Sequence, residues 1–133
     1  HEVLGDENMF LFGLTAEEAY HMSRGYDPYL LYTRDPVLRR VLDQLKAGFR
    51  DGVSYEDLYQ RLLFGVDCPA DQYLLLADFA SYCAASQRVT DTYRDRERWN
   101  SMSLHNIARS GIFSADRSVA DYADIIWHVP YKK

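Results

Sequence analysis

The side chains able to do chemistry in this sequence stand mostly alone, and a single pair has the spacing of a known type of metal centre. Glu18 and His21 are three residues apart, so a helix places both on one face, as in di-iron helical bundles. Such a centre needs a second Glu-x-x-His pair and two further carboxylates, and the sequence holds one pair. His105, within a predicted helix, and His128, at a predicted helix end, lack a second ligand at zinc spacing. We therefore predict solvated helix surface here and no metal site.

The serines give no sign of a catalytic nucleophile. A nucleophilic serine or cysteine needs a base within hydrogen-bonding reach, and the Gly-x-Ser-x-Gly turn of hydrolases is absent from the sequence. Ser54 and Ser114 lie at predicted helix caps, and Ser101 and Ser103 lie within a predicted helix. We predict that the chain contains no catalytic residue.

The lysines do not suggest a cofactor site either. A Schiff-base cofactor such as pyridoxal phosphate requires a lysine that can lose its proton. Lys46 lies at a solvated helix end, and Lys132 and Lys133 are the last two residues. The sequence also lacks a glycine-rich loop that would hold a phosphate. We predict no cofactor-binding residue in this chain.

The aromatic residues leave two interpretations open. The sequence contains 11 tyrosines, and Tyr26, Tyr29 and Tyr32 cluster around an Asp-Pro pair at positions 27–28. Aromatic rings bury a large area and keep a polar tip, so packing against neighbouring helices is the interpretation we favour. Stacking against a sugar is the alternative.

Length, charge and hydropathy describe a globular protein of ordinary composition. A chain of 133 residues that is 47% hydrophobic can bury roughly two thirds of the surface of its unfolded state. The net charge of -5 argues against nucleic-acid or anionic-membrane binding, because both need a basic surface. Neither a membrane span nor a signal peptide is visible, which predicts a cytoplasmic protein. We expect Cys68 and Cys83 to be reduced, with Cys83 in the core.

The front of the chain predicts a strand. Residues 9–12 form an apolar run closed by Gly13, as expected for a buried strand, and residues 73–76 are either a second extended piece or the start of a helix. A buried strand needs partners on both sides, and this chain offers little to pair with it.

The rest of the chain predicts helices, because capping residues precede apolar residues at helical spacing. Thr15 and Glu18 have the capping-box spacing, and Asp35-Pro36 starts a helix that stops near Gly48. Further helices are predicted to begin at Ser54, within residues 73–79, at Asp95 and at Ser114, with a turn over residues 65–70.

Short motifs in a fixed order resemble a known family. They are DENMFLFG at 6–13, RGY at 24–26, VLDQL at 41–45, LADFASY at 76–82, QRV at 87–89, YRD at 93–95 and SGIFSADR at 110–117, ending at IW at 126–127. In this order and spacing they resemble the C-terminal region of glycogen, starch and maltodextrin phosphorylases. The chain departs from the usual family pattern at Arg50, Ile112 and His128.

This resemblance implies an enzyme that uses phosphate to release glucose 1-phosphate from the non-reducing end of an α-1,4-glucan. The family binds pyridoxal phosphate through a lysine, and the family's catalytic and cofactor residues correspond to positions before His1. The resemblance therefore implies that residues 1–133 are the second part of a Rossmann-like α/β C-terminal lobe, ending at the natural C-terminus without an internal domain boundary.

The resemblance further implies a structural piece that is inactive alone and whose partner is the remainder of the phosphorylase chain. Separated from that partner, the piece is expected to expose apolar surface and self-associate. The alternative is a free-standing helical module that binds a glucan or a protein.

Overall fold

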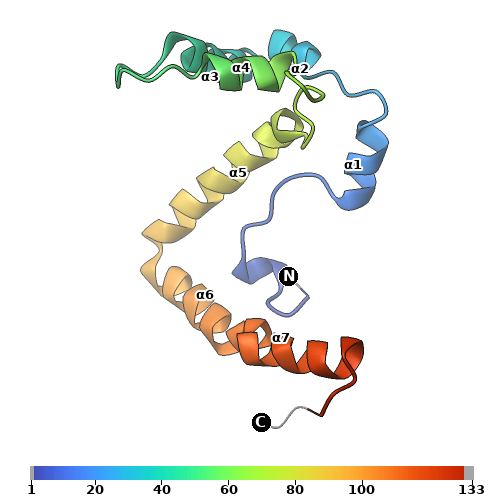
Figure 1. The fold of residues 1–133 in the computed structure, drawn as a ribbon. Coiled ribbons are helices and arrows are strands. Elements are labelled where there is room, and N and C mark those ends of the chain that lie inside the picture. The colour runs from blue at the N-terminus through green and yellow to red at the C-terminus, as the bar shows by residue number, and fades with distance from the viewer. Residues whose placement is uncertain (1, 131–133) are drawn as a thin grey trace. The chain divides into compact units, whose positions relative to one another are not determined.

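The computed structural model describes residues 2–130, which are mainly helical and contain no β-strand (Figure 1). In chain order, the α-helices within these residues are α1 (Ala16–Met22), α2 (Pro28–Arg34), α3 (Pro36–Ala47), α4 (Glu56–Leu63), α5 (Leu75–Arg94), α6 (Arg96–Arg109) and α7 (Ala115–Asp121). Short 3-10 helices form at Asp6–Asn8 (η1) and Ser110–Phe113 (η2), and a π-helix (η3) forms at Tyr122–Ile126. No helix in the described part of the chain has the length and apolar character needed to cross a membrane.

The chain divides into two compact units. Residues 12–86 form one, called here the central unit, and residues 2–11 with 87–130 form the other, called here the terminal unit. Helix α5 contributes its first residues to the central unit and its last residues to the terminal unit.

In the central unit, local capping chemistry sets the helix starts. The backbone N–H of Glu18 donates to the Thr15 hydroxyl at 3.3 Å, and the Thr15 N–H donates to the Glu18 carboxylate at 2.8 Å. This reciprocal pair confirms the predicted capping box, a feature that stabilises a helix by about 1 kcal/mol. Asp35 likewise accepts from the N–H groups of Val37 and Leu38, and α3 ends before Gly48, as predicted.

Helix α2 was not predicted from the sequence. Asp27 accepts a hydrogen bond from the Leu30 N–H at 3.2 Å, and Pro28 occupies the first helical position. This is the Asp-Pro signal that also starts α3. A seven-residue helix results between two loops.

The hydrophobic core lies in the central unit, where α3, α4 and the start of α5 meet. Its buried side chains are Leu38, Leu42, Tyr59, Leu63 and Leu76, with Leu31, Tyr32, Leu45, Leu62 and Phe79 packed against them. Burial of each large apolar side chain contributes roughly 1.5–3 kcal/mol to folding. This cluster therefore holds the central unit together.

The terminal unit has far less core. Asp95 and Ser114 cap α6 and α7, as predicted. Within the described residues of this unit, Met102 and Ala123 are the buried apolar side chains. Many large apolar side chains are exposed instead: Leu11, Tyr93, Leu104, Ile107, Phe113, Val119, Tyr122, Ile125, Ile126, Trp127 and Val129.

Three expectations about local structure need correction or a choice between alternatives. Residues 9–12 form no strand: Met9 is extended, with φ -149° and ψ 165°, but no described segment pairs with it. Residues 73–76 open a helix, because Leu74 lies in a turn with φ 59° and α5 begins at the next residue. Cys83 is exposed on α5 and lies outside the core, and both Cys68 and Cys83 are free thiols.

Candidate functional site

In the terminal unit, side chains of α5 and α6 hold the leading segment of the chain. They donate hydrogen bonds to four main-chain carbonyls between residues 3 and 11, a segment that forms no β-ladder with the described residues. The pairs are Arg109 with Val3 at 2.5 Å, Asn106 with Asn8 at 2.9 Å, Arg88 with Leu11 at 2.9 Å, and Arg98 with Glu7. Of the segment predicted to be a strand, residues 9–12, the Leu11 carbonyl is thus satisfied by a side chain, and the other three carbonyls lie before that segment.

The central unit holds the next residues in a similar manner. The Gly13 N–H donates to the Ser81 hydroxyl, and the Leu14 N–H donates to the Asp78 carboxylate, each at 2.8 Å. Gly13 has φ 90°, and a Cβ added there would lie 2.9 Å from an Asp78 carboxylate oxygen. Both the backbone angle and the approach of Asp78 therefore require glycine.

An open groove lies in the terminal unit between residues 8–10 and one face of α6. Its volume is about 520 Å³, and it is lined by Asn8, Met9, Phe10, Trp99, Met102, Ser103, Asn106 and Ile107. The Phe10 and Trp99 rings stack with centroids 6.3 Å apart. The Ser103 hydroxyl donates to the Trp99 carbonyl at 3.0 Å, which fixes its proton. The described lining residues carry no charge and include no acid–base pair, so the groove suits binding better than catalysis.

A buried carboxylate organises the start of α5. Asp71 is 5% exposed and accepts hydrogen bonds from the N–H groups of Leu75 at 2.9 Å and Leu76 at 2.8 Å. The Tyr26 hydroxyl donates to the same carboxylate at 2.5 Å. Burial, together with the hydrogen bond to Asp71 and its charge, raises the pKa of Tyr26 above its ordinary value. Tyr26 is thus a fixed donor that joins the loop before α2 to α5.

Sequence reasoning missed Asp71, although a usable signal was present. An aspartate a few residues before an apolar helical run is a typical N-terminal cap. Asp71 and Leu74 also adopt the left-handed backbone region, with φ 40° and 59°, a conformation that costs energy for residues other than glycine. The hydrogen bonds to Asp71 offset part of that cost.

The residues considered as metal ligands have other roles. Glu18 completes the cap with Thr15, whose hydrogen bonds lower the pKa of the Glu18 carboxyl. The His21 ring contacts Tyr20, with centroids 5.6 Å apart. His105 and His128 each make an Nδ1 contact of 2.9 Å to a carbonyl four residues earlier. Within residues 2–130, no group of three or more potential ligands comes together.

The predicted capping serines and the lysines are placed as follows. Ser114 is the N-cap of α7 and accepts from the Arg117 N–H at 3.2 Å, as predicted. The prediction for Ser54 was wrong by one residue: it accepts from the Glu56 N–H at 3.4 Å, but the N-cap of α4 is Tyr55, whose side chain makes no capping hydrogen bond. The Lys46 ammonium lies 5.5 Å from the centre of the Tyr59 ring. Lys132 and Lys133 lie outside the described residues. That the chain holds no catalytic or cofactor residue stays a prediction.

The rings of Tyr29 and Tyr32 pack against other rings. Their centroids are 5.6 Å apart, Tyr29 lies 5.6 Å from Phe64, and Tyr32 lies 6.3 Å from Tyr59. The Tyr32 hydroxyl donates to Asp43 at 2.8 Å, and this bond raises the pKa of Tyr32. These contacts agree with the packing interpretation.

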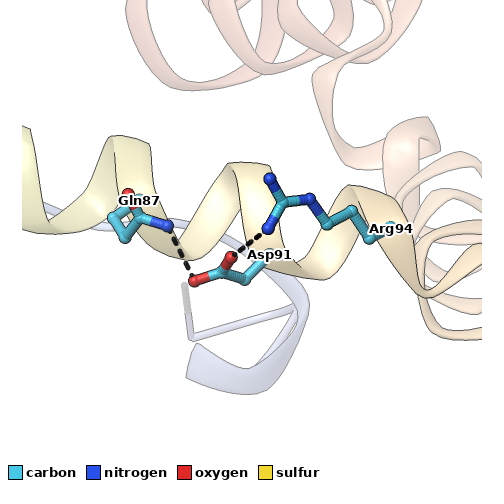
Figure 2. A network of polar contacts seen from close by, with 3 residues as sticks. All are labelled: Gln87, Asp91 and Arg94. Carbon is cyan, nitrogen blue, oxygen red and sulfur yellow. Dashed lines mark hydrogen bonds and ion pairs between the residues drawn. The ribbon is translucent and has the colours of Figure 1, made fainter.

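A polar network of Gln87, Asp91 and Arg94 lies on the solvent-exposed face of α5. Figure 2 shows Asp91 accepting from Gln87 at 3.0 Å and from Arg94 at 3.2 Å. The three residues follow helical i, i+3 and i, i+4 spacing, and exposed pairs of this kind contribute about 0–1 kcal/mol. The network supports the helix.

Comparison with known proteins gives matches along nearly the whole chain. Residues 1–129 match the family model described as Phosphorylase: Carbohydrate phosphorylase. The glycogen phosphorylase of Chlamydia pneumoniae is 38% identical over 131 residues, which is 98% of this chain and 16% of that relative. That of Bacillus subtilis is 38% identical over 132 residues, or 96% of this chain and 16% of the relative. The muscle form from Bos taurus is 36% identical over 132 residues, covering 96% and 15%. The chain therefore spans about one sixth of the length of these curated relatives.

Proposed function

Because the chain belongs to the carbohydrate phosphorylase family, we propose that it is one part of a longer α-1,4-glucan phosphorylase. The observation that carries this proposal is the match over residues 1–129, combined with coverage of only 16% of the first relative's length. The longer protein would use phosphate to release glucose 1-phosphate from a glucan in the cytoplasm. It would bind pyridoxal phosphate through residues outside this chain.

The role we propose for residues 1–133 is structural, as the second part of a Rossmann-like α/β lobe that is inactive alone. The exposed apolar side chains of the terminal unit support this role, since large exposed apolar surface marks a site of interaction. In the longer protein, residues 9–12 would pair as a strand with other parts of the chain. Their apolar run and the extended backbone of Met9 support that arrangement.

The test is a chimera in which this chain replaces the matching 131-residue region of the Chlamydia pneumoniae glycogen phosphorylase. We expect the chimera to release glucose 1-phosphate from glycogen and phosphate. The same relative truncated before the region, and the chain alone, should both be inactive. A soluble chimera without activity beside an active parent enzyme would contradict the proposal.

The proposed division of cofactor residues has its own readout. Reduction of the chimera with borohydride should attach pyridoxal phosphate to a lysine outside residues 1–133, as located by peptide mass spectrometry. Stoichiometric labelling of Lys46 would show instead that this chain carries the cofactor.

A further inference from the structure

We propose that the central unit is an inserted domain that folds without the terminal unit, and that contacts between its two ends stabilise the terminal unit. The inference goes beyond the proposed function and does not depend on it. It adds an internal domain boundary, which the sequence analysis did not expect.

The path of the chain is that of an insertion. Residues 2–11 and 87–130 belong to the terminal unit, and the continuous segment between them forms the central unit. The terminal unit is therefore built from two parts of the chain, whereas the central unit is built from one. A host domain tolerates an insertion when the two ends of the inserted segment lie close together.

The two ends of the central unit are joined by direct contacts. Residues 12–14, where the chain enters the unit, contact residues 78–82 of α5, near where it leaves, across 64 or more positions of sequence. These end contacts are a hydrogen bond from the Gly13 N–H to the Ser81 hydroxyl and one from the Leu14 N–H to the Asp78 carboxylate, each at 2.8 Å, and an edge contact of the Phe12 and Tyr82 rings, with centroids 5.3 Å apart.

The central unit also has a core of its own. The buried side chains of that core, and the partly buried ones packed against it, come from residues 31–79. The buried Asp71 carboxylate accepts from Tyr26 and from the start of α5, all within the same unit. The unit is longer than the roughly 55–65 residues over which many small domains fold alone. It thus supplies its own hydrophobic and polar contacts.

The terminal unit depends more on its surroundings. Met102 and Ala123 are its buried apolar side chains among the described residues, and its leading segment is separated from α6 in sequence by the whole insertion. Closing a loop costs conformational entropy that grows with the length of the loop. The end contacts shorten that loop from the whole insertion to a few residues. The folded central unit therefore lowers the cost of attaching the leading segment to α6.

Hydrogen exchange of the 133-residue chain, in dilute solution and increasing urea, tests whether the two units open separately. Read at single amides, α6 should open at a lower urea concentration than α3 and α4, which should open together. One urea midpoint shared by all three helices would overturn the inference.

Two core substitutions perturb one unit each. Leu42, 2% exposed, lies in the central unit, and Met102, 6% exposed, lies in the terminal unit. We expect Leu42→Ala to raise the exchange rates of α3 and α4 by about thirtyfold or more, and that of α6 by about twofold or less. Met102→Ala should raise exchange in α6 alone, and it decides the question even if Leu42→Ala fails to fold. Changes of similar size in both units would overturn the inference.

The end contacts have a separate readout at Asn8. Its backbone N–H donates to the Gly5 carbonyl at 3.1 Å, so the exchange of this amide reports on the order of the leading segment. Asp78→Ala removes the acceptor of the Leu14 N–H and should raise exchange at Asn8 by about tenfold. Asp78→Asn keeps a side-chain oxygen that can accept and should raise it by about threefold or less. Unchanged exchange at Asn8 in Asp78→Ala would overturn the role of the end contacts.

Discussion

The Asn106 amide nitrogen donates to the main-chain carbonyl of Asn8 at 2.9 Å, joining α6 to a residue 98 positions earlier in the chain. The same nitrogen donates to the Met102 carbonyl at 2.9 Å, within its own helix. One side chain therefore bridges α6 and the leading segment. Neither end of this contact is visible from local sequence patterns.

We expect Asn106→Ala to loosen the leading segment without unfolding α6. The change removes one hydrogen bond, whose net contribution is about 1 kcal/mol, and leaves the Asn8 carbonyl without that donor. Hydrogen–deuterium exchange followed by mass spectrometry should show faster exchange in residues 2–11. Asn100→Ala, at an exposed asparagine of the same helix, is the control and should leave this exchange unchanged.

Gly13→Ala should destabilise the central unit by more than about 1 kcal/mol, because alanine disfavours a φ of 90° and its Cβ would crowd Asp78. Gly25→Ala is the matched control, since its Cβ would meet no atom within 4 Å. Urea denaturation followed by circular dichroism measures both variants. Equal midpoints for the two would contradict the account of Gly13.

Leu42→Ala should cost about 2–5 kcal/mol, because it leaves a cavity in the core formed by α3, α4 and α5. Val41→Ala, one residue earlier and exposed, should cost less than about 1 kcal/mol. Thermal unfolding of the two variants side by side tests which face of α3 is buried.

Tyr26→Phe should lower stability by about 1–3 kcal/mol at neutral pH, since Asp71 loses a donor. The pKa of Tyr26 is raised in the folded state from the ordinary 10.0. The contribution of the Tyr26 hydroxyl to the free energy of unfolding is therefore fully present below pH 10 and decreases as the pH rises above 10. The difference in unfolding free energy between wild type and Tyr26→Phe should therefore be constant up to about pH 9 and shrink above pH 10. A difference that grows at alkaline pH would contradict this assignment.

The isolated chain should self-associate, because apolar side chains on α6, α7 and η3 are exposed. Light scattering should give a mass that rises with protein concentration. A clean monomer with slowly exchanging amides over residues 9–12 would contradict this expectation.

The predicted helix starts were confirmed where the signal is local. The cap of α1 involves residues 15 and 18, and that of α3 involves residues 35–38, so a short stretch of sequence contains the whole interaction. Helix α2 carries the same Asp-Pro signal, at Asp27 and Pro28, but was not predicted from it.

The features that depend on distant segments were not predictable. Residues 9–12 have the composition of a strand, but a strand forms only where another segment pairs with it. The side-chain donors to the carbonyls of Val3 and Leu11 come from 106 and 77 positions away. The groove likewise combines residues 8–10 with α6, which no periodicity relates.

The hydrogen bonds that hold residues 3–11 also determine how this segment can detach from the helices. A β-ladder opens as a cooperative unit, whereas the carbonyls of Val3, Asn8 and Leu11 each accept a hydrogen bond from a different side chain on α5 or α6. These hydrogen bonds can break independently while the helices stay folded. The segment can therefore lose its arginine and asparagine partners one at a time, without unfolding of the helices.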